Sequence, residues 1–128
     1  MRASEVAKVG YAGMSFVTGN TSEPLRNDTL GSLLKEQAKR NGDKTALVSW
    51  TGASYSYKNF YERCIHVAQA LLGSGVRPGD HVGIFAENCE VYVELFFACA
   101  LISTVSVVLN SNYTSSELAS ALVAAGWC

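Results

Sequence analysis

Three glycines and a proline precede an apolar run in residues 71–89, LLGSGVRPGDHVGIFAENC, and glycines next to a strand can hold phosphate groups. A dinucleotide-binding turn carries G-x-G-x-x-G after a strand and before a helix. Here Gly73, Gly75 and Gly79 follow a predicted helix and precede a predicted strand, and Pro78 stands where the third glycine is required. The P-loop pattern G-x-x-x-x-G-K-[ST] is also absent. We therefore expect a helix stop and a turn.

The histidines and serines show no catalytic spacing. His66 falls beside the apolar stripe of a predicted helix, and His81 opens a predicted strand, without a carboxylate or cysteine at catalytic spacing. Ser115 and Ser116 lie in the first turn of the last predicted helix, with no base near them in the sequence. We assign no catalytic residue and no cofactor-binding residue.

The cysteines are placed singly along the chain. Cys64, Cys89, Cys99 and Cys128 form no C-x-x-C motif and have no histidine pair nearby. The sequence therefore predicts neither a metal site nor a disulfide framework. Free thiols of this kind are typical of an intracellular, reducing compartment.

One polar run follows a predicted strand. The run AENCE, residues 86–90, lies at the carboxyl end of that strand, where open α/β sheets bind ligands. We interpret Asn88 as the N-cap of the following helix, with a ligand contact as the alternative.

The elements that position these residues follow the order β-β-α-β-α-β-α from residue 45 onward. The pattern first predicts a helix capped by Thr29 and a hairpin turning at Thr51-Gly52. A helix capped by Ser56, a helix from about Cys89 to Leu101, and a last helix with a Thr114 to Glu117 capping box follow.

Two predicted strands, residues 82–86 and 105–109, are apolar at nearly every position. This pattern is typical of parallel strands that are covered on both faces. The sequence thus predicts an α/β fold, a layered domain with a mostly parallel sheet and flanking helices, over residues 28–128. Residues 1–27 are expected to form an extended lead-in.

Composition restricts the partners. The chain has 128 residues, 48% hydrophobic and 16% charged, with a net charge of −1, so it has no electrostatic footprint for nucleic acid. Residues 91–109 are long enough to be tested as a membrane span and contain a single charge, Glu94. Their second half is β-branched after a Ser-Thr break, which favours a buried helix followed by a strand. We predict no membrane span.

Residues 53–128 together resemble the opening of an AMP-forming acyl-CoA synthetase of the adenylate-forming superfamily. Family members read threonine-tyrosine, a capped helix, GV-x-x-GD-x-V, a strand, an asparagine-glutamate motif, an apolar helix, a strand ending in L-N, a tyrosine and EL. The matching positions in this chain are Ser56-Tyr57, Gly75-Val76, Gly79-Asp80, Val82, Asn88, Glu90, Leu109-Asn110, Tyr113 and Glu117-Leu118.

The resemblance has limits. It covers roughly residues 15–128, and SFVTGNTSEPL, NSNYTSSEL and GWC are similar to the fatty-acyl or medium-chain branch. Family members usually carry glycine where Ser103 stands and proline where Ser111 stands. Only the early part of a whole family member is matched, so the chain is expected to be an incomplete N-terminal subdomain of the adenylate-forming fold.

The resemblance implies a reaction that joins a fatty acid to CoA through an acyl-adenylate, with ATP and Mg²⁺. In the family, a Thr/Ser/Gly-rich loop ending in Pro-Lys-Gly and a C-terminal lysine hold and activate ATP, and this chain contains no such loop. We therefore expect no cofactor for this chain alone and no ligase activity from it.

The alternative is a function of a different class, a binding or regulatory α/β module that docks on a full-length paralogue. The low charge content and the apolar helix near residues 89–101 favour it, because exposed apolar patches mark partner sites. Exposed apolar surface of this kind could also join two copies of the chain. A stand-alone nucleotide-binding flavodoxin-like domain is disfavoured by the reversed order of glycines and elements.

Overall fold

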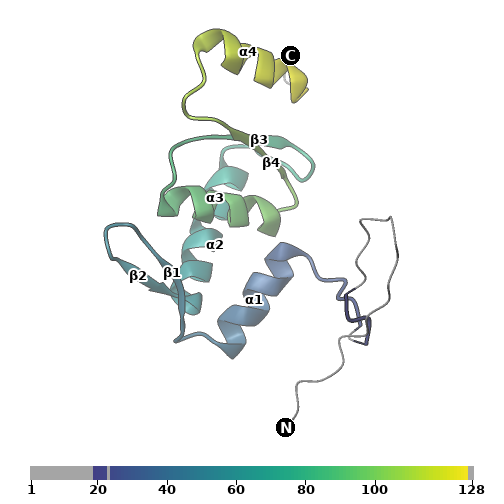
Figure 1. Ribbon diagram of the computed structural model, residues 1–128, viewed down its shortest axis with the longest axis vertical. Coiled ribbons are helices and arrows are strands. Elements are labelled where there is room, and N and C mark those ends of the chain that lie inside the picture. The colour runs from purple at the N-terminus through teal and green to yellow at the C-terminus, as the bar shows by residue number, and fades with distance from the viewer. Residues whose placement is uncertain (1–18, 23, 127–128) are drawn as a thin grey trace, which may run out of the picture.

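A computed structural model describes residues 19–22 and 24–126. The helices are α1 (Leu30–Arg40), α2 (Tyr57–Gly73), α3 (Glu90–Leu101) and α4 (Ser115–Ala124). The strands are β1 (Thr45–Val48), β2 (Ser54–Ser56), β3 (His81–Phe85) and β4 (Val105–Leu109). The predicted element order is confirmed, and Figure 1 shows α4 at one end beside β3 and β4, with the hairpin and α1 toward the other end.

The helix starts follow from local hydrogen bonds. The side chains of Thr29, Ser56 and Thr114 each accept a backbone N–H three residues later, so each satisfies a donor that the first helical turn leaves without a partner. At Thr114 the Glu117 carboxylate also bonds back to the cap, which completes the capping box. The predicted caps at these three positions are confirmed.

The ends of α2, α3 and α4 share one backbone conformation, a left-handed residue just beyond the helix, at Gly75, Ser103 and Gly126. After α2, the Val76 N–H donates to the Leu71 carbonyl and the Gly75 N–H to the Leu72 carbonyl, both at 3.1 Å, and Gly75 has φ +98°. This Schellman pairing requires a left-handed residue just beyond the helix. Ser103 holds the same place after α3 with φ 59°, and is the non-glycine residue with positive φ within 19–22 and 24–126.

The core lies where three helices and the hairpin meet. Leu34, Phe60 and Cys64 are its buried centre. The Phe60 and Phe97 rings join α2 to α3 edge to face, with their centroids 5.5 Å apart. The partly buried residues around this centre come from β1, β2, α2 and α3: Ala46, Leu47, Tyr55, Tyr57, Tyr61, Val93, Phe97 and Leu101.

The strands form two small sheets. β1 and β2 pair antiparallel as the predicted hairpin, with a register irregularity between Thr45 and Leu47. β3 and β4 pair parallel in regular register from His81–Val105 to Phe85–Leu109, with α3 as their crossover. The α/β class is confirmed, and its parallel part is this one pair of strands.

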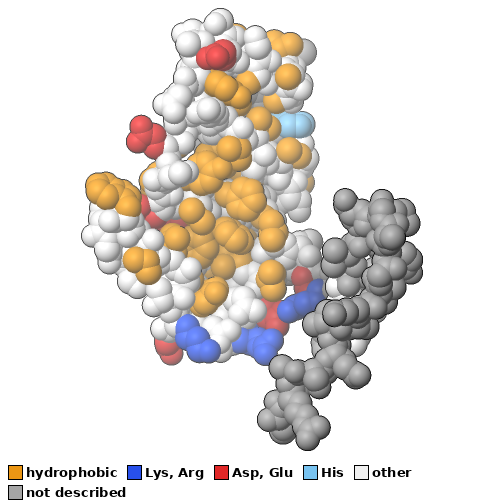
Figure 2. All heavy atoms as spheres, viewed as in Figure 1, with side chains coloured by type: hydrophobic (Ala, Val, Ile, Leu, Met, Phe, Trp, Pro, Cys, Tyr) orange, Lys and Arg blue, Asp and Glu red, His pale blue; other side chains and the backbone are white. Residues whose placement is uncertain are grey.

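The prediction that both parallel strands are covered on both faces is wrong. Phe85, Val105 and Val108 are 49%, 46% and 55% exposed, whereas Ile84 and Leu109 are buried. The physical reason is that α3 is the helix packed on these strands. Figure 2 shows apolar side chains over the middle of this face, at the level of α3 and α2, whereas the Lys and Arg side chains gather at the end opposite α4.

Part of the predicted lead-in can be placed. Residues 1–18 and 23 lie outside the described residues, whereas 19–22 and 24–27 are exposed and form neither helix nor strand. Arg26 bonds Asp28 at 2.7 Å and also pairs with Glu36 of α1. Among the described residues, no helix has the length and apolar character needed to cross a bilayer.

Candidate functional site

The glycine-rich loop is organised by its own chain. Besides the Schellman pairing at Gly75, the Arg77 N–H donates to the Asp80 carboxylate at 2.7 Å and the Asp80 N–H returns to the Arg77 carbonyl at 3.0 Å. Gly79 has φ +90°, and its N–H donates to the Ser103 carbonyl. The loop thus stops α2 and turns the chain into β3, as predicted.

A polar hollow of about 540 Å³ lies at the carboxyl ends of β3 and β4. Parallel pairing places the residues after the two strands side by side. The Asn112 N–H donates to the Asn110 side chain at 3.0 Å, and the Tyr113 N–H donates to the Asn110 carbonyl at 3.0 Å, which shapes the loop after β4. The lining residues are Ala86, Glu87, Asn88, Tyr92, Val108, Leu109, Asn110, Ser111 and Asn112.

Asn88 does not cap α3, so that prediction is wrong. The N-cap is Cys89, with extended backbone at φ −146° and ψ 168° and no side-chain cap hydrogen bond. The helix begins one residue later than the Asn88 cap requires, which leaves the exposed Asn88 side chain at the hollow. The alternative, a ligand contact by Asn88, stays a prediction.

A second hollow, about 230 Å³, lies between β1 and the start of α3. The Ser49 hydroxyl donates to the Glu90 carboxylate at 3.1 Å across it, although Ser49 is only 8% exposed. This bond fixes the hairpin to α3. The lining is mainly apolar: Leu47, Val48, Ser49, Trp50, Asn88, Cys89, Glu90 and Val93.

A buried carboxylate sits one helical turn further along α3. Glu94 has a side chain only 5% exposed, and the Arg63 guanidinium donates to it at 2.5 Å. The hydrogen bond that Arg63 donates to the Glu94 carboxylate raises the pKa of Arg63. Arg63 also stacks over the Tyr55 ring at 5.1 Å, so one side chain joins α2, α3 and β2. The pairing of Glu94 with Arg63 was missed, although a single charge within an apolar run is the signal that calls for a partner.

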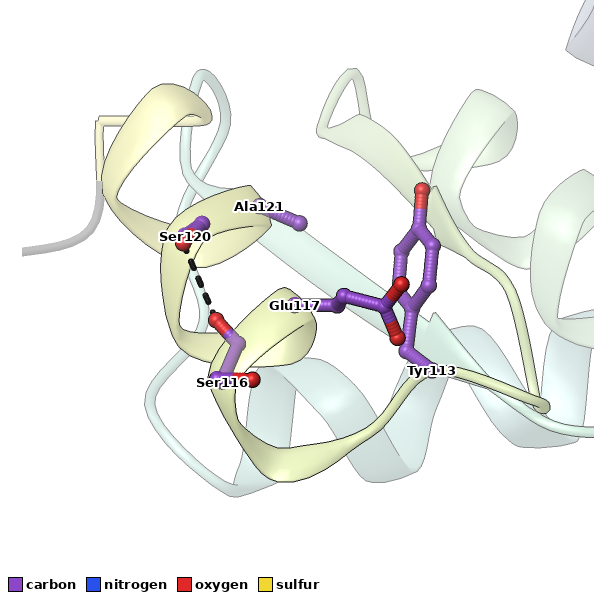
Figure 3. A pocket seen from close by; sticks show the side chains of 5 residues that line it. All are labelled: Tyr113, Ser116, Glu117, Ser120 and Ala121. Atoms are coloured by element: carbon purple, nitrogen blue, oxygen red, sulfur yellow. Dashed lines mark hydrogen bonds between the residues drawn. The ribbon is translucent and has the colours of Figure 1, made fainter.

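The third hollow, about 450 Å³, is formed by Tyr113, Ser116, Glu117, Ser120 and Ala121. Figure 3 shows the Glu117 side chain directed toward the Tyr113 ring, and the Ser120 hydroxyl bonded to the Ser116 carbonyl at 2.9 Å. The Glu117 carboxylate accepts the Thr114 N–H at 2.8 Å and its hydroxyl at 2.7 Å, and these bonds lower the pKa of Glu117. The carboxylate is thus held at the N-cap of α4 by the hydrogen bonds of the capping box.

The described histidines and cysteines are not among the residues that line the polar hollow at the ends of β3 and β4. Cys89 lines the second hollow, between β1 and α3. His66 and His81 are exposed, whereas Cys64 and Cys99 are fully buried free thiols. Burial raises the pKa of Cys64 to about 12, with nearby Glu94 adding to the effect. Cys128 lies outside the described residues. In residues 19–22 and 24–126, no group of His, Cys, Asp and Glu is arranged to hold a metal ion.

Comparison with known families gives a match to the AMP-binding enzyme family over residues 34–127, which is most of the chain. The chain belongs to the AMP-binding enzyme family. Among curated relatives, the acyl-CoA ligase sidI of Aspergillus fumigatus is 44% identical over 85% of this chain, and the medium-chain acyl-CoA ligase ACSF2 of mouse mitochondria is 33% identical over 83%. The chain spans 19% and 17% of these two relatives' lengths.

Solved structures agree with this assignment. The chain superposes on the N-terminal subdomain of Klebsiella oxytoca NpsA, determined with anthranilyl-AMSN, with a TM-score of 0.73 and 26% identity, over 77% of this chain and 25% of that one. The resemblance to an N-terminal subdomain of adenylate-forming enzymes is thereby confirmed. In this chain, the motif residues Asn88, Asn110 and Tyr113 all follow the carboxyl ends of β3 and β4.

Proposed function

We propose that this chain supplies an amino-terminal scaffold of an acyl-CoA ligase. The parent reaction joins ATP, a fatty acid and CoA through an acyl-adenylate, and gives acyl-CoA, AMP and pyrophosphate. The observation that carries the proposal is the family match over residues 34–127, together with relatives named acyl-CoA ligases. The free thiols support an intracellular setting for this reaction.

We further propose that these 128 residues do not catalyse the reaction alone. Displacement of pyrophosphate needs clustered amide donors and a cation that neutralise the phosphates. The three hollows are lined by carboxylate, amide, hydroxyl and apolar side chains, and no Lys or Arg lines any of them. This donor set does not fit a polyphosphate. ATP, Mg²⁺ and CoA are therefore assigned to the longer relatives.

The role left to this chain is to hold the loops after β3 and β4 in place. The α2–α3 core, the Arg63–Glu94 pair and the Ser49–Glu90 bond all fix α3, which starts at the hollow and connects the two strands. A rigid element beneath a site keeps the loops above it positioned.

A segment exchange tests the proposal. Residues 34–127 replace the matching segment of the Aspergillus fumigatus ligase, and thioester formation is measured with that enzyme's own acid, ATP, Mg²⁺ and CoA. The expected result is an active chimera, with no product from the isolated chain. A folded, soluble chimera without activity would contradict the scaffold role, and product from the isolated chain would contradict its inactivity. A chimera that also carries Phe60→Ala, which removes the ring at the α2–α3 contact, should lose both its folded structure and its activity.

The second candidate function is a non-catalytic module that docks on a full-length paralogue. The observation favouring it is the exposed apolar set Phe85, Val105, Val108 and Val123 around β3, β4 and α4. The test is co-sedimentation of the purified chain with a full-length relative, together with that relative's ligase rate. A mixture that sediments as two independent species with an unchanged rate would exclude this candidate.

A further inference from the structure

A tight turn connects β4 to α4, and Asn110 organises it. The Asn112 N–H donates to the Asn110 side-chain oxygen and the Tyr113 N–H donates to the Asn110 carbonyl, both at 3.0 Å. The first bond makes an Asx turn and the second closes a β-turn. Neither Ser111 nor Asn112 has positive φ, so the β-turn is of type I rather than type II, I′ or II′. Asparagine is favoured at the first position of a type I turn, which is the position of Asn110.

Both ends of this turn are anchored. Leu109, the last residue of β4, is buried and pairs with β3. At the other end, the Glu117 carboxylate accepts the Thr114 N–H at 2.8 Å in the capping box. Between these anchors, within the part of the chain that the structure describes, the side chains of residues 111–113 make no hydrogen bond. The side chain that holds the turn itself is therefore that of Asn110.

The turn carries part of the lining of the polar hollow at the strand ends. Asn110, Ser111 and Asn112 line the hollow from the side of β4, and Glu87 and Asn88 line it from the side of β3. The backbone torsions inside a tight turn set the direction of the chain beyond it. A loosened turn would therefore change the shape of the hollow and the direction in which α4 leaves β4.

We propose that Asn110 is a positioning residue for the ligase reaction: its side-chain oxygen holds the turn, and the turn holds the loop after β4 at the hollow. The inference rests on the proposed scaffold function and names the residue through which this loop is held. Ser111 increases the demand on Asn110. Proline, which fixes φ at about −65°, is favoured at the second position of a type I turn, whereas serine leaves φ free. Without the Asn110 acceptor, the turn loses its main local restraint.

Amide hydrogen exchange of the 128-residue chain, measured by NMR and corrected for intrinsic rates, tests this restraint. Asn110→Ala removes the acceptor of the Asn112 N–H, so the Asn112 and Tyr113 amides should both exchange about two- to tenfold faster. Asn110→Asp keeps a side-chain acceptor and should leave both rates near those of the parent chain. Adding Ser111→Pro to Asn110→Ala should slow the Tyr113 amide again while the Asn112 amide stays fast, because proline restores the turn without replacing the acceptor. The matched control Asn112→Ala keeps the Asn110 side chain and should leave the Tyr113 amide unchanged.

The chimera with the Aspergillus fumigatus ligase tests the consequence for the reaction. Asn110→Ala should lower the rate of thioester formation about fivefold or more, and both Asn110→Asp and the double variant with Ser111→Pro should stay within about twofold of the parent chimera. The proposal is overturned if Asn110→Ala leaves the Tyr113 amide unchanged, or if it loosens the turn without lowering the rate. A parent chimera without activity would contradict the scaffold function, and with it the link to the reaction, whereas the exchange rates alone decide whether Asn110 holds the turn.

Discussion

Replacing Ser103 by glycine should stabilise the protein. Ser103 stands just beyond α3 with φ 59°, in the left-handed region, and its side chain is exposed. The Thr104 N–H donates to the Cys99 carbonyl at 3.0 Å and the Gly79 N–H to the Ser103 carbonyl at 2.8 Å, so backbone bonds on both sides hold this conformation. Glycine would keep these bonds and remove the steric conflict of the Cβ atom.

The magnitude follows from two opposing terms. Left-handed backbone costs a non-glycine residue about 1–2 kcal/mol. The added freedom of glycine in the unfolded chain takes back about 0.4–1 kcal/mol. The net gain in the free energy of unfolding should be about 0.5–1 kcal/mol, which raises Tm by roughly 2–6 °C in a domain of this size.

Urea unfolding monitored by circular dichroism measures this gain in the free energy of unfolding, and two control variants test its cause. Ser103→Ala keeps the Cβ atom and should give no gain. Gly75→Ser should destabilise the protein, because Gly75 has φ +98° in the same Schellman position. This substitution introduces at the end of α2 the strain that Ser103→Gly removes at the end of α3. If Ser103→Gly and Ser103→Ala had equal stability, the left-handed strain would not explain this residue.

Three further predictions concern contacts made by the helices. Gly31→Ala should lower the free energy of unfolding in urea by about 1–3 kcal/mol, because a Cβ atom at this position of α1 would lie 3.0 Å from the Ala100 carbonyl oxygen of α3. A gain in stability, which helix propensity alone predicts, would contradict this reasoning. Arg63→Met should lower the free energy of unfolding by about 1–3 kcal/mol, because it leaves buried Glu94 without its cation; the loss is smaller than for a fully buried pair because Arg63 is 41% exposed. Adding Glu94→Leu should restore most of this loss. A double variant as unstable as the single one would refute that account. The pKa of Glu117 is lowered, chiefly by the hydrogen bond from the Thr114 N–H, so its stabilisation of α4 is present above the unfolded pKa near 4.5 and is lost as pH falls through the folded value. Helicity measured by circular dichroism should drop in that pH range. Glu117→Gln should remove this pH dependence.

The local elements were predictable because their causes are local. Caps at Thr29, Ser56 and Thr114 use hydrogen bonds over three residues, and the stop at Gly75 uses a backbone conformation that glycine adopts freely. The parallel pairing of β3 and β4 was predictable because a helical crossover separates two apolar strands.

The candidate site was only partly predictable. The sequence indicated that the AENCE run follows a strand, and parallel pairing places it beside Asn110–Asn112. It did not indicate that Cys89, rather than Asn88, caps α3, because a one-residue shift at a helix start depends on how α3 packs against α2 and the hairpin.

The sequence by itself determined the element order, the helix caps at Thr29, Ser56 and Thr114, and the family, because these depend on short spacings and recognisable motifs. Only the tertiary structure decided that Arg63 neutralises Glu94, that Ser49 bonds Glu90, and that Val105 and Val108 of β4 are exposed. These contacts join residues 31 and 41 positions apart, and exposure depends on every element packed nearby, so no local pattern contains them.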